Sequence, residues 1–195
     1  MSALLALSRT IEARDPYTRG HSARVARTAH AVGVRLGCDE GRLALLRLGG
    51  VLHDVGKLVI SEVVLSKPGP LTPDELVEVR GHPEAGARMV ALDRSLWPTL
   101  PGVLYHHERW DGLGYPTGRA GSEIPLEARI LAVADCFDAM TSDRPYRAAL
   151  RHEEAIAEVD RCRGSQFDPD VALVFLEAWE SGAFGVTAAL RAAAG

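Results

Sequence analysis

The stretch Leu43-Ala44-Leu45-Leu46-Arg47-Leu48-Gly49-Gly50-Val51-Leu52-His53-Asp54-Val55-Gly56-Lys57 joins an apolar run to a polar motif. Its first ten residues are apolar around most of a helical circumference, with Arg47 as the single charge, which is typical of a buried helix. The run ends directly in His53 and Asp54. A carboxylate in such a setting is costly unless it is paired or bound to a metal. The stretch therefore predicts a buried helix that ends at a chemical site.

A second apolar run of the same kind leads into two aspartates. Residues 130–134 are followed by Asp135, Cys136, Phe137 and Asp138, and the run is apolar nearly all round. Asp135 and Asp138 stand three residues apart on one helical face, so one could bind an ion while the other orients the ligands. For Asp135 alone, a buried salt bridge or a helix cap explains the pattern about as well.

The rest of the chain also indicates helices. Alternating apolar and polar stretches rich in Val, Ile and Thr, which favour strands, do not occur. Asp39 and the Thr72-Pro73-Asp74-Glu75 segment supply helix caps, and the glycine-rich residues 109–124 form a long loop of the kind that is often functional. The expected helices cover 3–14, 21–36, 39–52, 97–107, 125–140, 153–163 and 169–180, with two more starting near 72 and 82. The sequence predicts an all-α, single-domain helical bundle over 1–195, with its core at about 11–175 and an alanine-rich tail at about 184–195.

Composition narrows the classes of function. The 26 acidic residues outnumber the 22 lysines and arginines and give a net charge of −4, so the basic surface that a nucleic-acid polymer binder needs is missing. The three cysteines have no CxxC spacing and are typical of reduced thiols. Neither a signal peptide nor a run of membrane-spanning length occurs. We expect a cytoplasmic protein that does not bind nucleic-acid polymers or membranes.

Histidines near helix ends add ligand-type side chains to the aspartates. Of the seven histidines, His30 and His152 are interpreted as surface or core residues. The other five, with two carboxylates and a bridging water, would suit two octahedral ions if one carboxylate bridges them. Mixed imidazole and carboxylate ligands with open positions favour iron or manganese over structural zinc. These five are His21, His53, His82, His106 and His107.

Longer motifs resemble a known family. His53-Asp54, with His21 upstream and Asp135 downstream, resembles the metal signature of the HD phosphohydrolase superfamily. HDVGK at 53–57, HHERWDGLGYP at 106–116 and DRPYR at 143–147 are similar to its HD-GYP branch. The similarity covers about residues 11–175, and the ordered set of motifs is specific where a lone HD dipeptide would not be.

The resemblance implies a helical bundle that cleaves the 3′,5′-phosphodiester of cyclic di-GMP. The expected first product is pGpG, formed by a hydroxide that bridges two divalent ions, iron or manganese, with further cleavage to GMP left open. By resemblance, one ion is held by His21, His53, Asp54 and Asp135, and the other by Asp54, His82, His106 and His107.

The resemblance also implies roles for residues around the ions. Lys57 lies near the bridging hydroxide, where it assists protonation or anchors phosphate, and it acts together with Asp54. Arg144 and Arg147 contact the ligand phosphates. Tyr115 belongs to the GYP loop, which lines the pocket and offers a surface to a diguanylate cyclase or an adaptor protein. Asp138 orients the ligands without binding an ion.

One position departs from the pattern of the family. Some relatives carry a glutamate four residues before the first ligand histidine, where it helps to hold a third ion. This chain has Tyr17 there, which implies two ions and leaves cleavage beyond pGpG in doubt. Two other hypotheses stay open. One is an HD phosphohydrolase acting on another nucleotide, and the other is a binding module with little activity.

Overall fold

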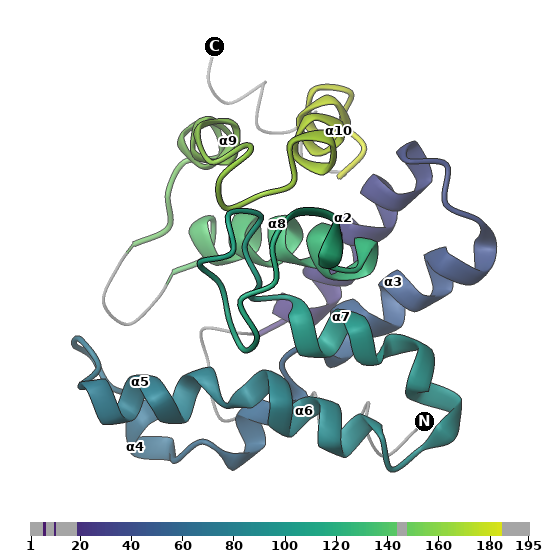
Figure 1. Cartoon of the computed structure of the whole chain (residues 1–195). Coiled ribbons are helices and arrows are strands. Elements are labelled where there is room, and N and C mark those ends of the chain that lie inside the picture. The colour runs from purple at the N-terminus through teal and green to yellow at the C-terminus, as the bar shows by residue number, and fades with distance from the viewer. Residues whose placement is uncertain (1–5, 7–9, 11–18, 144–147, 185–195) are drawn as a thin grey trace.

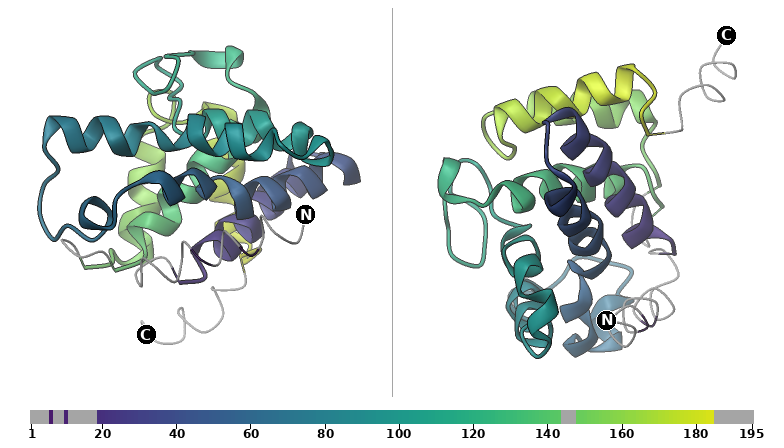
Figure 2. Two further views of the ribbon diagram at one scale, coloured as in Figure 1. Left: turned by 90° about the horizontal axis from the view of Figure 1, so that it is seen from below. Right: turned by 90° about the vertical axis from the view of Figure 1, so that its right-hand side faces the viewer.

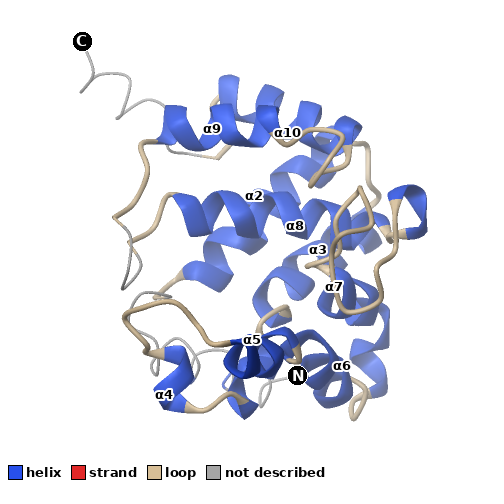
Figure 3. Ribbon diagram, turned by 60° about the vertical axis from the view of Figure 1, so that its left-hand side comes forward, coloured by secondary structure: helices blue, strands red, loops and turns tan. Residues whose placement is uncertain are grey.

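The computed structural model describes Ala6, Thr10 and residues 19–143 and 148–184, and within these residues the expected helices are present except that one is divided (Figure 1). Among these residues no strand forms, apart from one isolated bridge between Arg163 and Phe167, and Figure 3 shows helices joined by loops. The all-α prediction is confirmed. None of the described helices is both long and apolar enough to cross a bilayer. The elements are α2 (His21–Arg35), α3 (Glu40–Leu52), η2 (Val55–Val59), α4 (Glu62–Leu65), α5 (Pro73–Arg80), α6 (His82–Val90), η3 (Arg94–Thr99), α7 (Leu100–Tyr105), η4 (Gly121–Glu123), α8 (Leu126–Met140), α9 (His152–Arg161) and α10 (Pro169–Glu180).

The predicted caps start the helices where the sequence places them. The Asp39 side chain accepts a hydrogen bond from the Arg42 backbone N–H at the start of α3, at 2.7 Å. At the start of α5, Thr72 Oγ1 accepts from the Glu75 N–H at 3.3 Å, and the Glu75 carboxylate accepts from the Thr72 N–H at 2.7 Å. Each cap of this kind is worth about 1 kcal/mol.

One predicted helix is divided. The segment expected as a helix over 97–107 consists of the 3₁₀ helix η3 and the short helix α7, because Pro98 and Pro101 lack the N–H that a continuous helix needs. The helix predicted at 3–14 falls mostly outside the described residues. Within it, Ala6 and Thr10 are helical, and Thr10 Oγ1 donates to the Ala6 carbonyl at 3.0 Å.

The helices lie in three levels that enclose an apolar core. α2, α3 and α8 occupy the middle, α9 and α10 cover them on one side, and α4 to α6 lie on the opposite side (Figures 1 and 2). α2 packs against α3 and α8, while α6 packs against η2 and α7. The main core is built from fully buried side chains on the middle and upper helices, including Val25, Leu46, Leu131 and Phe175. A smaller core of Leu52, Val55, Val90, Leu96 and Val103 supports the lower level.

Two glycines allow the helices that carry the polar motifs to approach closely. A Cβ atom on Gly50 would lie 2.6 Å from the Ala26 Cα, so α3 contacts the backbone of α2 there. A Cβ atom on Gly56 would lie 1.9 Å from the His82 carbonyl oxygen, so η2 contacts the start of α6. The two glycines lie on either side of His53 and Asp54, so both contacts position the segment that carries this pair.

Candidate metal centre

The five histidines and the two aspartates of the expected ligand set converge on one region. Most of them stand at helix ends: His21 begins α2, His82 begins α6, and His53 follows α3 directly. The full set consists of His21, His53, Asp54, His82, His106 and His107 from these ends, with Asp135 from within α8.

The first group of potential ligands contains Asp54, His82, His106 and His107, whose ligand atoms all lie within 4.8 Å of one another. His82 Nε2 is 3.2 Å from Asp54 Oδ1 and 3.3 Å from His106 Nε2. Three of these residues are buried, and His107 is partly exposed. The group therefore has the donor types and the spacing of a site for a divalent cation.

The second group contains His21, His53 and Asp54, within the same 4.8 Å. His21 Nε2 lies 3.3 Å from His53 Nε2 and 3.2 Å from Asp135 Oδ1, which places Asp135 beside this group. Asp54 belongs to both groups: its Oδ1 faces His82, and its Oδ2 lies 3.4 Å from His53 Nε2. One carboxylate is thus placed between two sets of imidazoles.

Hydrogen bonds to backbone carbonyls fix the histidine tautomers. The Nδ1 atoms of His53, His82 and His106 lie 2.7–2.8 Å from the carbonyl oxygens of Gly50, Val79 and Val103. A carbonyl only accepts, so each Nδ1 donates, and in the neutral ring the Nε2 lone pair faces the cluster.

Facing lone pairs need a cation. If unprotonated, the Nε2 atoms of His82 and His106, 3.3 Å apart, repel one another, and Asp54 Oδ1 has no hydrogen-bond partner among the described residues although it is buried. An ion between these atoms would satisfy all of them. The residues present therefore fit bound divalent cations.

Asp138 and Arg24 hold His21 in place. His21 Nδ1 donates to Asp138 Oδ2 at 2.7 Å, and Arg24 Nε donates to Asp138 Oδ1 at 2.6 Å. A carboxylate on the far nitrogen of a ligating imidazole sets its orientation and raises its basicity. Burial lowers the pKa of His21, but the hydrogen bonds with Asp135 and Asp138 outweigh it and raise that pKa to about 9. The surroundings of His21 thus favour a positive charge.

Two further histidines and the shared aspartate have the protonation states that metal ligands require. Burial lowers the pKa of His107 to about 3 and holds that of His106 well below its usual value. Burial raises the pKa of Asp54, but Lys57 and His53 outweigh it and hold that pKa well below the ordinary value. Neutral imidazoles beside an ionised carboxylate can bind a cation without first losing a proton.

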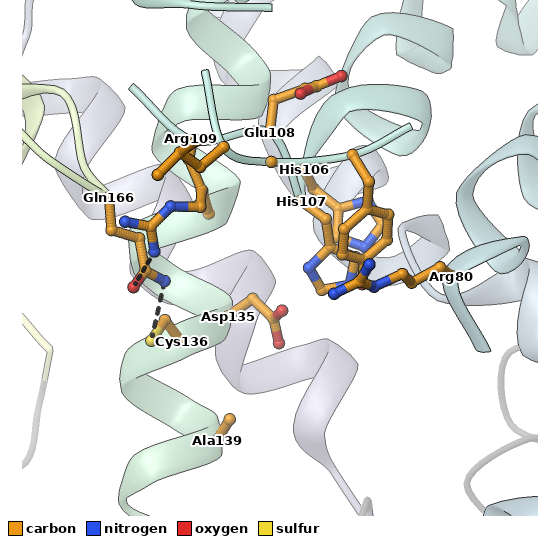
Figure 4. A pocket seen from close by; sticks show the side chains of 13 residues that line it. Arg80, His106, His107, Glu108, Arg109, Asp135, Cys136, Ala139 and Gln166 are labelled. Atoms are coloured by element: carbon orange, nitrogen blue, oxygen red, sulfur yellow. Dashed lines mark hydrogen bonds between the residues drawn. The ribbon is translucent and has the colours of Figure 1, made fainter. Parts of the chain in front are cut away.

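A pocket of about 350 Å³ opens on one side of the cluster. Figure 4 shows Asp135 projecting from α8 toward His107, with Arg80 on the same side as the histidine pair and Arg109 and Gln166 on the other. The Tyr115 ring stacks on His107, with ring centroids 4.8 Å apart and planes inclined by 23°. The expected pocket residue Tyr115 therefore lies against a potential ligand.

The loop predicted at 109–124 folds back onto the histidine pair. The Tyr115 N–H donates to the His107 carbonyl at 3.2 Å. Buried Glu108 accepts from both the N–H and the Oγ1 of Thr117, each at 2.7 Å. A Cβ atom on Gly114 would lie 2.3 Å from the backbone nitrogen of Arg109, so the loop passes close to its own first residue. These contacts fix the position of Tyr115.

Of the remaining predicted residues, one contacts the cluster, three lie outside the described residues, and two histidines lie elsewhere in the fold. Lys57 Nζ donates to Asp54 Oδ2 at 2.5 Å, so Lys57 adjoins the shared carboxylate. Arg144, Arg147 and Tyr17 lie outside the described residues, so the expected phosphate contacts and the number of ions stay predictions. His30 accepts a hydrogen bond from Arg47, and His152 stacks on Trp179 with centroids 5.2 Å apart.

The sequence interpretation missed several residues of the site. Arg24 follows His21 by three positions on the same helix, so its place on that face could have been inferred from spacing. Arg80 and Gln166 line the pocket, and Glu108 anchors the loop. None of these three stands in a spacing that distinguishes it from an ordinary surface residue.

The fold and the site together define an all-helical protein with two buried histidine–carboxylate groups that share one aspartate. The model of the HD domain family matches residues 6–171, and the chain belongs to that family. It is closely related to the HD-GYP cyclic di-GMP phosphodiesterases.

Two curated relatives and one solved structure illustrate the relationship. The chain is 42% identical over 165 residues to the cyclic di-GMP phosphodiesterase response regulator RpfG of Xanthomonas campestris, covering 84% of this chain and 44% of that protein. It is 38% identical over 166 residues to the 3′3′-cGAMP-specific phosphodiesterase 3 of Vibrio cholerae, covering 85% of this chain and 36% of that protein. The chain thus spans less than half of the length of these relatives.

The solved structure supports the fold. A cyclic GMP-AMP specific phosphodiesterase of V. cholerae superposes with a TM-score of 0.74 at 22% identity, covering 93% of this chain and 49% of that one.

Proposed function

We propose that this chain is a metal-dependent phosphodiesterase that hydrolyses cyclic di-GMP, with pGpG as the first product. The observation that carries the proposal is the position of Asp54 between two groups of imidazoles. A carboxylate shared in this way suits a pair of cations, and paired cations are a recurrent device for phosphoester hydrolysis. The donor set thus fits a pair of cations, and the names of the relatives favour phosphoryl chemistry among the reactions that such a pair supports.

The expected ligands divide between two ions. His21, His53, Asp54 and Asp135 would hold one, and Asp54, His82, His106 and His107 the other. When bound, two divalent ions, iron or manganese, supply an activated water and neutralise the charge that develops on the phosphoryl oxygens. The hydrogen bonds from Nδ1 to the backbone orient the rings of His53, His82 and His106 so that their Nε2 atoms would be available to the ions.

Lys57 is the residue that we assign to the leaving group. Hydrolysis of the ring breaks the bond from phosphorus to the ribose 3′ oxygen, which needs a proton as it leaves. The Lys57 ammonium is 2.5 Å from Asp54 and one-fifth exposed, so it would adjoin a phosphate bound at the shared carboxylate and can reach solvent. No cysteine is needed as a nucleophile, and burial raises the pKa of the Cys136 thiol to about 12, which keeps it protonated at neutral pH.

The names of the relatives suggest two cyclic dinucleotides as candidate substrates. The Xanthomonas relative is named for cyclic di-GMP, and the Vibrio relative at similar identity for 3′3′-cGAMP. Both substrates contain the same ring of two riboses and two phosphates and differ in one base. We assign cyclic di-GMP because the relative of higher identity is named for it, and 3′3′-cGAMP is the second candidate.

The deciding experiment is product analysis with protein purified anaerobically and loaded with iron or manganese. Cyclic di-GMP, 3′3′-cGAMP and cyclic di-AMP are incubated separately, and the products are separated by chromatography. We expect pGpG from cyclic di-GMP and no turnover by the Asp54→Ala variant. Preferred cleavage of 3′3′-cGAMP would change the assigned substrate from cyclic di-GMP to 3′3′-cGAMP, and the assigned phosphodiesterase reaction would stand. Tight binding of cyclic di-GMP without cleavage would favour a binding module instead.

Two expectations from the family resemblance complete the proposal. Arg144 and Arg147 contact the substrate phosphates, since guanidinium groups bind phosphate through two parallel hydrogen bonds. Arg144→Ala should then raise KM clearly with little change in melting temperature, and unchanged kinetics would remove this role. The loop that carries Tyr115 is a candidate surface for a diguanylate cyclase or an adaptor protein.

A further inference from the structure

The pocket beside the histidine pair is lined by two arginines, Arg80 and Arg109, that differ in how their charges are neutralised. Arg109 pairs with Asp111 at 2.6 Å. Lys57, across the cluster, pairs with Asp54 at 2.5 Å. Arg80, the last residue of α5, has no carboxylate within ion-pair distance among the residues that the structure describes. A positive charge therefore remains at the edge of the pocket.

Aromatic contacts hold Arg80 in position. Its guanidinium carbon lies 5.5 Å from the centroid of the Tyr115 ring, which in turn stacks on His107. A guanidinium held over a ring face keeps its N–H groups available in its own plane. In Figure 4 Arg80 lies on the same side of the pocket as His107, and Asp135 projects from α8 toward that side. The exposed Arg80 side chain thus lies over Tyr115 at the pocket edge, and no hydrogen bond or ion pair to another described residue occupies its guanidinium.

We propose that Arg80 binds the second phosphate of a cyclic dinucleotide, the one that is not cleaved in the same turnover. This inference rests on the proposed function. The substrate carries two phosphates at a separation fixed by its ring, and the cluster accommodates one. The second anion then needs a cation nearby, and Arg80 offers one that no neighbouring carboxylate in the described structure neutralises. Arginine suits the task because its fork matches two phosphate oxygens.

The same donors could instead bind a base. Arginine commonly pairs with the O6 and N7 atoms of guanine, so contact with the guanine edge is the main alternative. The two alternatives differ in a measurable way. A phosphate contact serves every cyclic dinucleotide equally, whereas a guanine contact serves only nucleotides that carry guanine.

The experiment compares Arg80→Ala and Arg80→Lys with Arg88→Ala as the matched control. Arg88 is exposed on α6 and does not line the pocket. Three substrates are used with manganese-loaded protein: cyclic di-GMP, cyclic di-AMP and bis(p-nitrophenyl) phosphate, which has one phosphate and no base. Metal content and melting temperature are measured on each variant.

We expect Arg80→Ala to raise KM for both cyclic dinucleotides by a similar factor of roughly tenfold or more, as for a lost hydrogen bond to a charged group. Hydrolysis of bis(p-nitrophenyl) phosphate, metal content and melting temperature should stay at wild-type values. Arg80→Lys should recover part of the loss, and Arg88→Ala should show none.

Several outcomes would overturn the inference. A loss confined to cyclic di-GMP would assign Arg80 to the guanine edge, and unchanged KM for both dinucleotides would leave it as a surface residue. An equal loss for bis(p-nitrophenyl) phosphate would point to damage at the metal cluster. If the wild-type protein cleaves no cyclic dinucleotide, the proposed function fails. In that event, calorimetric binding of cyclic di-GMP decides the role of Arg80: equal affinity of wild type and Arg80→Ala, or no binding by either, refutes it.

Discussion

At the scale of single residues, the candidate centre depends most on Asp54. Its two oxygens face different partners, with Oδ1 toward His82 and Oδ2 toward His53 and Lys57. We expect Asp54→Ala to lose both ions, whereas His82→Ala, which removes a ligand from one group, should mainly weaken one. Elemental analysis of the purified variants measures the two stoichiometries.

His30→Ala is the matched control for this prediction. His30 bonds to Arg47 outside the cluster, so the variant removes an imidazole without removing a candidate ligand. It should keep the wild-type metal content. Retention of both ions by Asp54→Ala would show that the carboxylate is not shared.

A substitution of Lys57 can distinguish an effect on catalysis from an effect on metal binding. If its ammonium protonates the leaving oxygen, Lys57→Ala should lower kcat by roughly 10²-fold, the usual contribution of a positioned acid, with both ions still bound. Lys67→Ala provides the control because Lys67 pairs with Glu75, at 2.6 Å, instead of Asp54. Should the Lys57 variant lose its ions as well, the residue would instead serve to hold the Asp54 carboxylate in place.

At the scale of elements, the contact between η2 and α6 determines the distance between Asp54 and His82. Gly56→Ala would place a Cβ atom 1.9 Å from the His82 carbonyl oxygen, so the two segments must separate. We expect the free energy of unfolding to fall by about 1–3 kcal/mol, as for other overpacked contacts, and metal affinity to fall with it. Denaturant unfolding and metal titration measure the two effects.

Gly69→Ala is the control for the element contact. A Cβ atom at Gly69 meets nothing within 4 Å, so its free energy of unfolding should stay within about 0.5 kcal/mol of the wild-type value. Equal stability of the two variants would mean that η2 and α6 move apart without cost, and that the glycine does not control the geometry of the cluster.

The elements also show which parts of the fold are predictable from sequence. Asp39 and the Thr72 segment mark helix starts because their side chains act on backbone groups a few residues away. The division between η3 and α7 was missed although Pro98 and Pro101 signal it locally. The short helix α4 has a local signal that was missed, since the Ser61 side chain accepts from the Val64 N–H at its start, at 3.4 Å. The 3₁₀ helix η2 has no side-chain cap and packs against α6.

The site was less predictable from local pattern than the helices. Histidines at helix ends indicated ligands, but their convergence follows from contacts between segments far apart in sequence, such as His21 with Asp138, 117 positions away. The residue types alone suggested one set of seven ligands, and the resemblance to a family divided that set between two ions in advance. Arg80 was missed because two three-dimensional features distinguish it. It lies over the Tyr115 ring, and no carboxylate among the described residues pairs with it, and neither feature is visible in the spacing of the sequence.

At the scale of the whole molecule, the cluster connects the levels of the fold. Its side chains come from α2, the end of α3, the start of α6, the residues after α7, and α8. Ions bound there would add a direct link between segments that also meet through the apolar cores and through contacts such as His21 with Asp138. A site of this kind forms only in the folded chain, so ion binding contributes directly to the free energy of unfolding.

Removal of the ions should therefore lower the melting temperature of the whole domain. Without a cation, facing Nε2 lone pairs and the unpartnered Asp54 Oδ1 oppose the folded state. At ion concentrations 100 times the dissociation constant, binding stabilises by about 2.7 kcal/mol, which corresponds to roughly 5–10 °C for a chain of this size. Calorimetry of manganese-loaded and chelator-treated protein measures the shift, and the Asp54→Ala variant should show almost none. Equal melting temperatures of the loaded and stripped wild-type protein would mean that the cluster tolerates its facing lone pairs, for example by protonation, and would argue against ions as part of the folded structure.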